Sequence, residues 1–233
     1  MITYHRMALS NLTYLWIYFQ AMIPLLPTSY LPPLAYVAEI AHHGEVLIES
    51  HETFHKQTYR SRCEIYGANG ILPLSIPVFK PGGSHTKTKD IQISYHNGWQ
   101  HVHWISLLSA YNASPYFLYY KDYFEQFYFK KYKYLIDFNT ELLETIIRLI
   151  GKKCVISYTE QYKNKCIDVI DMRNAFNKRG KTKPSILVSY YQVFSCKYGF
   201  LPNLSIVDLL FNEGKQSLNY LFSIYMNDKG TAE

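Results

Sequence analysis

The apolar positions near the start of the chain follow the order strand, helix, strand. Residues 22–31 (MIPLLPTSYL) are mostly apolar, which predicts a buried strand. Pro32 and Pro33 open the next segment, and proline is tolerated in the first turn of a helix. We expect a helix from there to Gly44, and residues 45–49 (EVLIE) predict a second strand. This order indicates a parallel pair of strands and the α/β class.

The remaining apolar pattern places further elements in the same domain. Strands are expected over residues 70–78, 90–95, 154–158 and 185–194. Helical periodicity predicts helices over residues 99–111, 115–128 and 139–150. A last helix is expected from Ser205, where Asp208 suggests a capping box. We therefore predict a single α/β domain over residues 22–220, with a mixed, partly parallel β-sheet flanked by helices, and a C-terminal tail over residues 221–233.

The first 21 residues lie outside this predicted domain. Residues 12–26 (LTYLWIYFQAMIPLL) are apolar, but Gln20 and a proline interrupt them, and a spanning helix needs about 20 apolar residues. No clean small-residue cleavage site follows. Because Met22 begins the first predicted strand, we interpret Met22 as the true start and residues 1–21 as an extension without a structural role. A weak membrane anchor is the alternative.

Charge and composition suggest the chemistry of a partner. The chain has 24 Lys and Arg against 18 Asp and Glu, a net charge of +6, and residues 151–183 account for all of that excess. A local basic surface suggests a phosphate-bearing partner such as a sugar nucleotide, an anionic lipid surface or RNA, and a solvated connection is the alternative. The 23 tyrosines and 13 phenylalanines suit a polar ring-shaped ligand such as a sugar, or simply an aromatic core. The four cysteines lack CxxC spacing, so free thiols in a reducing cytoplasm are expected.

The segment over residues 51–78 holds the densest group of ionisable side chains. It begins just beyond the second predicted strand, and ligands of parallel sheets bind beyond the carboxyl ends of the strands. Burying so many ionisable groups unpaired would cost on the order of several kcal/mol each, so the segment is a solvated loop or a site. The side chains expected there to contact a substrate are Lys56, Gln57, Tyr59, Arg60, Arg62 and Asn69. Asn69 also fits an ordinary turn.

Three side chains are candidates for catalysis. His55 and Cys63 could form a base and a nucleophile, with the nearby arginines favouring the thiolate. A small buried cysteine at the start of a strand is the alternative for Cys63. His103 is a candidate acid or base, or else a hydrogen-bonded structural histidine. His101 and His103 could share a metal on a strand but not on the helix that the apolar spacing favours, so no metal ligands are predicted.

Familiar catalytic motifs are absent from the sequence, which contains no GxxxxGK[ST] phosphate loop, no GxSxG and no HExxH. The glycine-containing loop over residues 80–85 could close over a ligand or simply connect two strands. Tyr116, Tyr120, Phe124 and Phe127 recur with helical core spacing, which we interpret as packing rather than as a stacking platform. The sequence identifies no cofactor.

Three blocks of sequence resemble the WbqC-like protein family, in the style of its Bacteroidetes members. The first combines residues 56–65 (KQTYRSRCEI), 68–70 (ANG) and 74–78 (LSIPV). The second contains residues 99–100 (WQ), 103–104 (HW), 109–111 (SAY) and 114–117 (SPYF). The third contains residues 191–194 (YQVF), 199–200 (GF) and 202–214 (PNLSIVDLLFNEG), so the resemblance covers residues 22–214. Trp104 and Tyr111 of the second block complete the predicted substrate-binding set. Residues 27–30 (PTSY) depart from the Gln-Pro that many members carry there.

The resemblance implies a cytoplasmic bacterial protein associated with O-antigen and other surface-polysaccharide gene clusters. The leading hypothesis is an enzyme that acts on a sugar or sugar-nucleotide precursor, with acyl or related group transfer to an amino sugar as the reaction. A non-catalytic protein that binds a sugar nucleotide or carbohydrate is the first alternative. A nucleic-acid binder that uses residues 151–183 is the second. No stable membrane insertion is expected, and the oligomeric state is not predicted.

Overall fold

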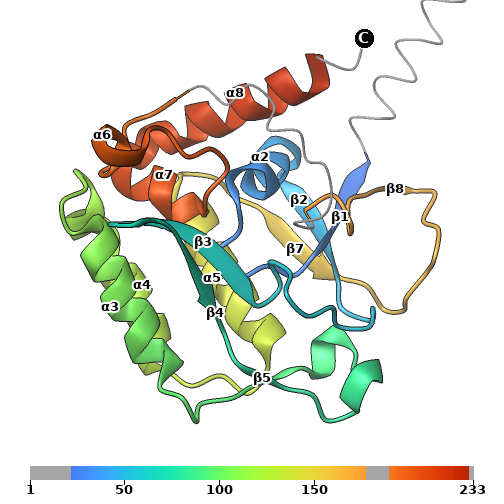
Figure 1. The fold of residues 1–233 in the computed structure, drawn as a ribbon. Coiled ribbons are helices and arrows are strands. Elements are labelled where there is room, and N and C mark those ends of the chain that lie inside the picture. Colours follow the sequence, from blue (N-terminus) through green and yellow to red (C-terminus); the bar gives the residue numbers. More distant parts are fainter. Residues whose placement is uncertain (1–21, 177–188, 231–233) are drawn as a thin grey trace, which may run out of the picture.

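The computed structural model describes residues 22–176 and 189–230, so the predicted extension over residues 1–21 lies outside the described part (Figure 1). The strands are β1 (Ile23–Pro27), β2 (Glu45–Glu49), β3 (Arg62–Gly67), β4 (Gly70–Ser75), β5 (Val78–Phe79), β6 (Gln92–Ile93), β7 (Val155–Tyr158) and β8 (Val169–Asp171). The α-helices are α2 (Leu34–His43), α3 (Trp99–Tyr111), α4 (Phe117–Phe129), α5 (Leu135–Leu149), α6 (Ser195–Tyr198), α7 (Ile206–Glu213) and α8 (Ser217–Gly230). Three short 3-10 helices join them: η1 (Gly83–His85), η2 (Thr88–Asp90) and η3 (Gly214–Gln216).

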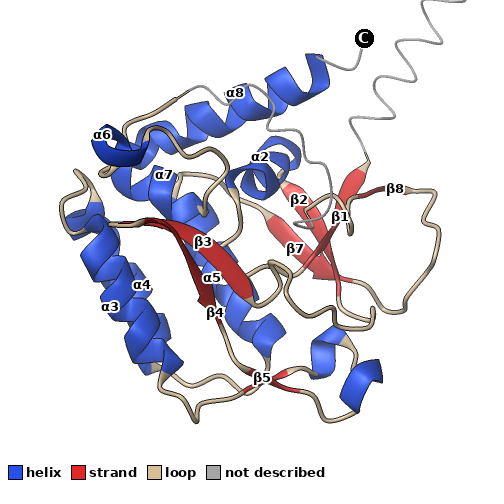
Figure 2. Cartoon of the chain, in the orientation of Figure 1, coloured by secondary structure: helices blue, strands red, loops and turns tan. Residues whose placement is uncertain are grey.

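A four-stranded parallel sheet positions the site. Its strand order is β7-β2-β1-β8, and each neighbouring pair is parallel. The predicted strand-helix-strand unit is confirmed, since β1 and β2 pair in parallel with α2 between them. The α/β class is confirmed as well, with helices beside the sheet (Figure 2). Antiparallel pairing occurs in the separate β3-β4 and β5-β6 pairs of the described part.

The two faces of the parallel sheet have different surroundings. Alternate residues of a strand point to opposite faces. Leu26 and Ile48 pair in register and belong to the main hydrophobic core. Leu25 and Leu47 pair one position earlier, so they point to the other face, where they line a pocket beneath the β7-β8 connection. The parallel sheet therefore contributes one face to the core and the other to a pocket.

The core is rich in aromatic rings that pack between the helices and the β3-β4 hairpin. Phe211 of α7 makes edge contacts with Phe117 and Phe124 of α4 at centroid distances of 5.0 and 5.2 Å. Phe124 and Phe127 are buried, which confirms the predicted packing role for that part of the helical series. Tyr116 at the start of the series is exposed instead. Within the described ranges, no helix is long and apolar enough to cross a membrane.

Several predicted boundaries differ from the structure for physical reasons. β1 ends at Pro27 rather than at residue 31, because the backbone N–H of Tyr30 leaves the sheet and donates to the Tyr59 carbonyl. The strand predicted over residues 185–194 is wrong for residues 189–194, which are not in a strand, and residues 185–188 lie outside the described part. α8 crosses the predicted boundary at residue 220, and its Leu221 is buried.

Candidate functional site

The carboxyl ends of the four parallel strands place polar side chains along one edge. Residues 28–29 follow β1, residues 50–52 follow β2, Thr159 follows β7 and Arg173 lies just beyond β8. Because the strands are parallel, these segments meet at the same edge of the sheet, which is where ligands bind in open α/β sheets. The structure therefore supports a candidate site at this edge.

A buried ion-pair network joins β2 to β8 at this edge. Arg173 donates from Nη1 to Glu49 Oε2 at 3.1 Å and from Nη2 to Asp171 Oδ2 at 2.5 Å. Its Nε donates to Asp171 Oδ1 at 2.9 Å, and these bonds lower the pKa of the Asp171 carboxyl. The other Glu49 oxygen accepts from Thr159 Oγ1 at 2.8 Å and from the His51 backbone N–H at 2.9 Å. Glu49 is 1% exposed and Arg173 is 5% exposed, so the paired charges form a fixed wall rather than a solvated surface.

Arg173 also fixes the connection that covers a pocket. Its Nη1 donates to the Lys163 carbonyl at 2.9 Å and its Nη2 to the Asn164 carbonyl at 3.4 Å. The pocket has a volume of about 470 Å³ and is lined by Leu25, Leu47, Glu49, Tyr158, Thr159 and residues 160–169 except Tyr162 and Asn164. Lys163 and Lys165 line it with exposed side chains, and neither forms an ion pair with any described residue. The lining therefore combines two lysines outside any ion pair with the carboxylates of Glu49, Glu160 and Asp168, and Glu49 is already paired with Arg173.

A chain of hydrogen bonds leads from this pocket to His51. Ser50 Oγ lies 3.0 Å from the Thr159 carbonyl and 2.9 Å from His51 Nδ1, and His51 Nε2 lies 3.0 Å from Lys89 Nζ. The carbonyl must accept from Ser50, so the Ser50 oxygen is left to accept from Nδ1–H. Nε2 then accepts from the Lys89 ammonium. This arrangement assigns a proton to Nδ1 and leaves Nε2 as the basic nitrogen.

The segment that carries His51 is held in place by residues 86–89. The backbone N–H of Phe54 donates to the Thr86 carbonyl at 3.0 Å, and the N–H of Lys89 donates to the Ser50 carbonyl at 2.9 Å. These bonds anchor the C-terminal end of the loop over residues 80–85 beside the site. Among the described residues, no group of three His, Cys, Asp or Glu side chains is placed to hold a metal ion.

The structure places Arg60, a predicted substrate contact, in a second buried ion pair at this edge. Its Nε and Nη2 donate to the two oxygens of Glu52 at 2.7 and 2.8 Å. Asn139 of α5 donates to the Arg60 carbonyl at 2.8 Å and to Thr28 Oγ1 at 3.1 Å, which connects the pair to the end of β1. Arg60 is 2% exposed, so in this conformation its guanidinium supports the site from inside.

Three other predicted residues lie on the exposed loop that follows His51. His55, Lys56 and Gln57 are all exposed, and Gln57 has a positive φ of 59°. The pKa of Lys80 is lowered by partial burial and by the charge of Lys56, which therefore lies close to it. This loop adds exposed basic side chains to the segment between His51 and Arg60.

His103 and Cys63 lie in the core. The Tyr30 hydroxyl is 2.9 Å from His103 Nδ1 and 2.9 Å from the Tyr128 hydroxyl. Burial lowers the pKa of His103 to about 4, although a hydrogen bond to the Ser75 backbone acts in the opposite direction. Burial also raises the pKa of the Cys63 thiol well above its usual range. A ligand would reach either side chain only after the core opened.

The other predicted residues are distributed between the core and the far end of the β3-β4 hairpin. Trp104 is buried and stacks on Tyr128 at a centroid distance of 5.7 Å. Tyr111 is buried and donates to Asp208 Oδ1 at 3.0 Å. Asn69 is exposed in the β3-β4 turn, as ordinary turn chemistry predicts. The remaining two, Tyr59 and Arg62, are half-buried, and Arg62 Nε has no hydrogen-bond partner among the described residues.

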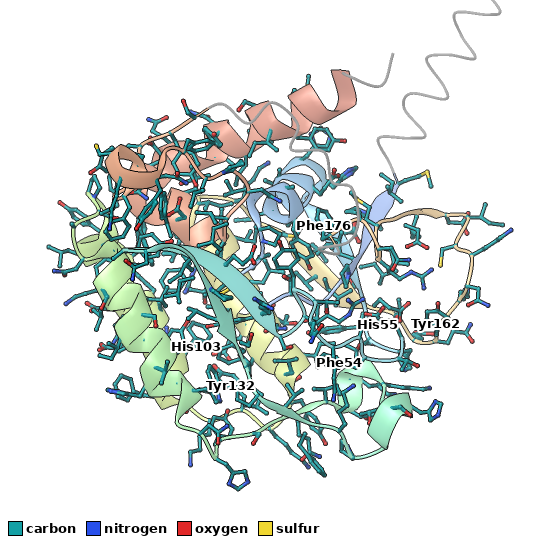
Figure 3. All side chains as sticks on the ribbon, viewed as in Figure 1. Phe54, His55, His103, Tyr132, Tyr162 and Phe176 are labelled. Carbon is teal, nitrogen blue, oxygen red and sulfur yellow. The ribbon has the colours of Figure 1, made fainter. Side chains whose placement is uncertain are left out.

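The predicted catalytic residues therefore occupy two different regions. Figure 3 shows His103 beside α3 and His55 on the other side of β4, toward the parallel sheet. Arg60 and the loop over residues 55–57 lie in the chain segment that follows β2, whereas His103 contacts the core residues Tyr30 and Trp99. His101 is exposed and His103 is buried on the same helix, so the two rings point in different directions.

Sequence reasoning did not select the residues that build the edge network. These are Glu49, Ser50, His51, Thr159, Lys163, Asp171 and Arg173. A usable signal was present, because each lies at or soon after the end of a short apolar run that forms a parallel strand. Ligands of parallel sheets bind beyond the carboxyl ends of the strands, so this rule indicated the correct edge of the sheet. The predicted residues instead followed the density of basic side chains, which is highest farther along the chain.

The fold and the edge pocket define a parallel α/β protein with a polar pocket, lined by lysines and carboxylates, at the carboxyl ends of its strands. The WbqC-like protein family matches residues 28–185, so the chain belongs to that family. The match includes the whole edge network but leaves residues 191–214, the third block of the resemblance, outside it. The chain is also similar to uncharacterized protein Rv1507c of Mycobacterium tuberculosis, with 25% identity over 224 residues, 85% of this chain and 96% of that protein. No solved structure matches.

Proposed function

We propose that this WbqC-like protein is a cytoplasmic enzyme of O-antigen or other surface-polysaccharide biosynthesis that acts on a sugar nucleotide or another sugar phosphate. The observation that carries the proposal is the pocket of about 470 Å³ at the carboxyl edge, with Lys163 and Lys165 on its wall. Pockets of this size suit small ligands, and the carboxyl edge of a parallel sheet is their usual place. The family's association with surface-polysaccharide gene clusters supports the substrate class.

The pocket offers separate contacts for the two parts of such a ligand. Lys163 and Lys165 would bind the phosphates as point charges. Leu25 and Leu47 supply an apolar floor on the sheet face, while Glu160 and Gln161 can bond to sugar hydroxyls. Arg173 contributes by fixing the carbonyls of Lys163 and Asn164, so it acts as a positioning residue.

The reaction that we propose is transfer of an acyl group from an acyl thioester to the amine of an amino sugar. The amine nitrogen forms a bond to the acyl carbon, and the carbon–sulfur bond breaks to release a thiolate. His51 Nε2 accepts the proton that the amine loses and returns it to the thiolate. Lys89 lies 3.0 Å from this nitrogen, so it must move aside or orient the acceptor as the substrate enters. A positioned base contributes about 10²–10⁴-fold to such a rate.

A thermal-shift panel tests the binding half of the proposal. The panel contains UDP-, GDP- and dTDP-sugars, acyl-CoAs, free nucleotides and a single-stranded oligonucleotide. A ligand at one hundred times its Kd stabilises the native state by about 2.7 kcal/mol, so one class of sugar nucleotide should raise the Tm. The shift should be lost in the Lys163→Gln/Lys165→Gln variant and kept in Lys153→Gln, an exposed lysine of the same basic segment that does not line the pocket.

A turnover assay separates an enzyme from a binding protein. Release of free thiol from an acyl-CoA series is followed in the presence of the amino-sugar nucleotide that binds. His51→Gln should reduce the rate at least about 100-fold and leave the thermal shift intact. His55→Gln tests the base predicted from the sequence. Ligand binding without any turnover would favour the non-catalytic alternative, and binding of the oligonucleotide alone would favour a nucleic-acid binder.

A further inference from the structure

A second pocket lies away from the carboxyl edge and is walled by tyrosines. It has a volume of about 660 Å³ and is lined by Tyr116, Tyr119, Tyr120, Tyr123, Arg148 and Lys215, with Leu149, Glu213 and Gln216 completing the wall. In Figure 1, α4 lies on the left of the molecule and the β7-β8 connection on the right, so the two pockets are on different sides. The second pocket therefore has its own ligand chemistry.

Three of the four tyrosines of this pocket are exposed at the surface, whereas Tyr120 packs into the core. Tyr119 and Tyr123 are one helical turn apart on α4, and Tyr119 is 74% exposed. The rings of Tyr116 and Tyr119 lie 6.4 Å apart at an angle of 46°. None of the four lining tyrosine hydroxyls has a hydrogen-bond partner in the described part of the chain. Open ring faces next to free hydroxyls suit a ligand with apolar C–H faces and polar edges.

One ring is fixed by a glycine contact. Tyr116 packs so closely on Gly214 that a Cβ at that position would lie 2.7 Å from the ring carbon Cδ1. The backbone N–H of Tyr116 also donates to the Phe211 carbonyl at 3.0 Å. This wall of the pocket is therefore formed before any ligand arrives, which lowers the entropic cost of binding.

The charges of the pocket select an anionic ligand. The lining contains two cations, Arg148 and Lys215, and one carboxylate, that of Glu213, so it carries one net positive charge. Arg148 forms no ion pair with a described residue, and its Cζ lies 6.0 Å from the Tyr123 ring centroid. A planar guanidinium beside an aromatic ring matches a carboxylate attached to a sugar ring. A nucleic-acid strand would need a longer series of cations than this pocket supplies.

We propose that this pocket is a binding site for an acidic sugar residue of a glycan, with the sugar ring on Tyr119 and Tyr123 and its carboxylate on Arg148. The site would hold the glycan independently of the chemistry at the carboxyl edge. Its ligand differs from the sugar nucleotide in having a ring-borne carboxylate and needing no phosphate.

Calorimetric titration of the full chain with tetragalacturonate, maltotetraose and oligo(dT) of six nucleotides tests the proposal. Tetragalacturonate should bind, and maltotetraose should bind at least about tenfold more weakly, because it lacks the carboxylate that Arg148 would bind. Arg148→Gln should weaken tetragalacturonate binding about tenfold, and Tyr119→Ala should weaken it by a similar factor. Tyr191→Ala, an exposed tyrosine outside the pocket, should leave binding unchanged.

The proposal is overturned if tetragalacturonate does not bind at millimolar concentration, or if its binding survives both pocket variants unchanged. Binding of oligo(dT) with no binding of tetragalacturonate would assign the tyrosines to a nucleic acid instead. Both substituted side chains are exposed, so circular dichroism should show native folding in each variant. Sugar-nucleotide binding at the carboxyl edge should be the same in Arg148→Gln as in the wild type, which keeps the two proposals distinguishable.

Discussion

Glu49 ends β2 with its carboxylate 3.1 Å from the guanidinium of Arg173, which lies two residues beyond β8. The pair connects two strands that are not neighbours in the sheet, since β1 lies between them. Removing Arg173 leaves the Glu49 carboxylate buried without an ion-pair partner, which costs about 3–5 kcal/mol for pairs of this kind. Removing the Glu49 charge leaves Arg173 paired with Asp171. We expect Arg173→Met to lower the free energy of unfolding by about 3 kcal/mol and Glu49→Gln to lower it by less, both measured by urea denaturation.

The double variant provides the control for this pair. If the main cost of Arg173→Met is the Glu49 charge left unpaired, Glu49→Gln with Arg173→Met should cost clearly less than the sum of the two single variants. Asp171 still faces the position of Arg173, so some cost from that carboxylate is expected to remain. Strictly additive losses would show that the two residues stabilise the edge independently.

Burial of His103 predicts a dependence of stability on acid. Its pKa is lowered from 6.5 to about 4, mainly by burial. The unfolded state therefore binds a proton more readily than the folded state. The stability that this pKa difference contributes to the folded state is fully present above pH 6.5 and is lost as the pH falls through about 4. Its limit is on the order of 3 kcal/mol. Urea unfolding between pH 4.5 and 7.5 should show this loss, and His103→Gln should remove it, whereas His101→Gln on the exposed side of the same helix should not.

Asp208 predicts the opposite dependence over nearly the same range. Burial raises the pKa of its carboxyl to about 6, although hydrogen bonds from Tyr190, Gln192 and Tyr111 act against the shift. The folded state thus binds the proton more tightly than the unfolded state. Its stabilising contribution is fully present below pH 3.8 and is lost as the pH rises through about 6, with a limit on the order of 3 kcal/mol. In Asp208→Asn, stability should rise more steeply from pH 4.5 to 6.5 than in the wild type. Equal slopes in the two proteins would argue against a titrating Asp208.

The sequence predicted the elements better than it predicted the environment of particular side chains. Periodicity located α3 and α4 within about two residues, because helical spacing is a local signal. The ion pair of Arg60 with Glu52 depends on the path of the loop after β2, which the sequence does not show. Arg60 was predicted to contact a ligand, but the structure buries it in this pair. Asp208 shows the same limit, since its spacing from Ser205 suggested a capping box but its carboxylate accepts from Tyr111 instead.

Gly214 links the tyrosine pocket to the stability of the fold. Its φ of +57° and ψ of −129° are unfavourable for a residue with a side chain, and a Cβ there would also force Tyr116 to move. We expect Gly214→Ala to lower the free energy of unfolding by about 1–3 kcal/mol, measured by urea denaturation, and to weaken tetragalacturonate binding. Gly199→Ala is the matched control, because Gly199 has a φ of +73° and no described atom lies within 4 Å of the place where a Cβ would stand. Gly199→Ala should lower stability through the backbone alone and keep glycan binding. A loss of binding in both variants would show that the Tyr116 contact is not the cause of the loss in Gly214→Ala.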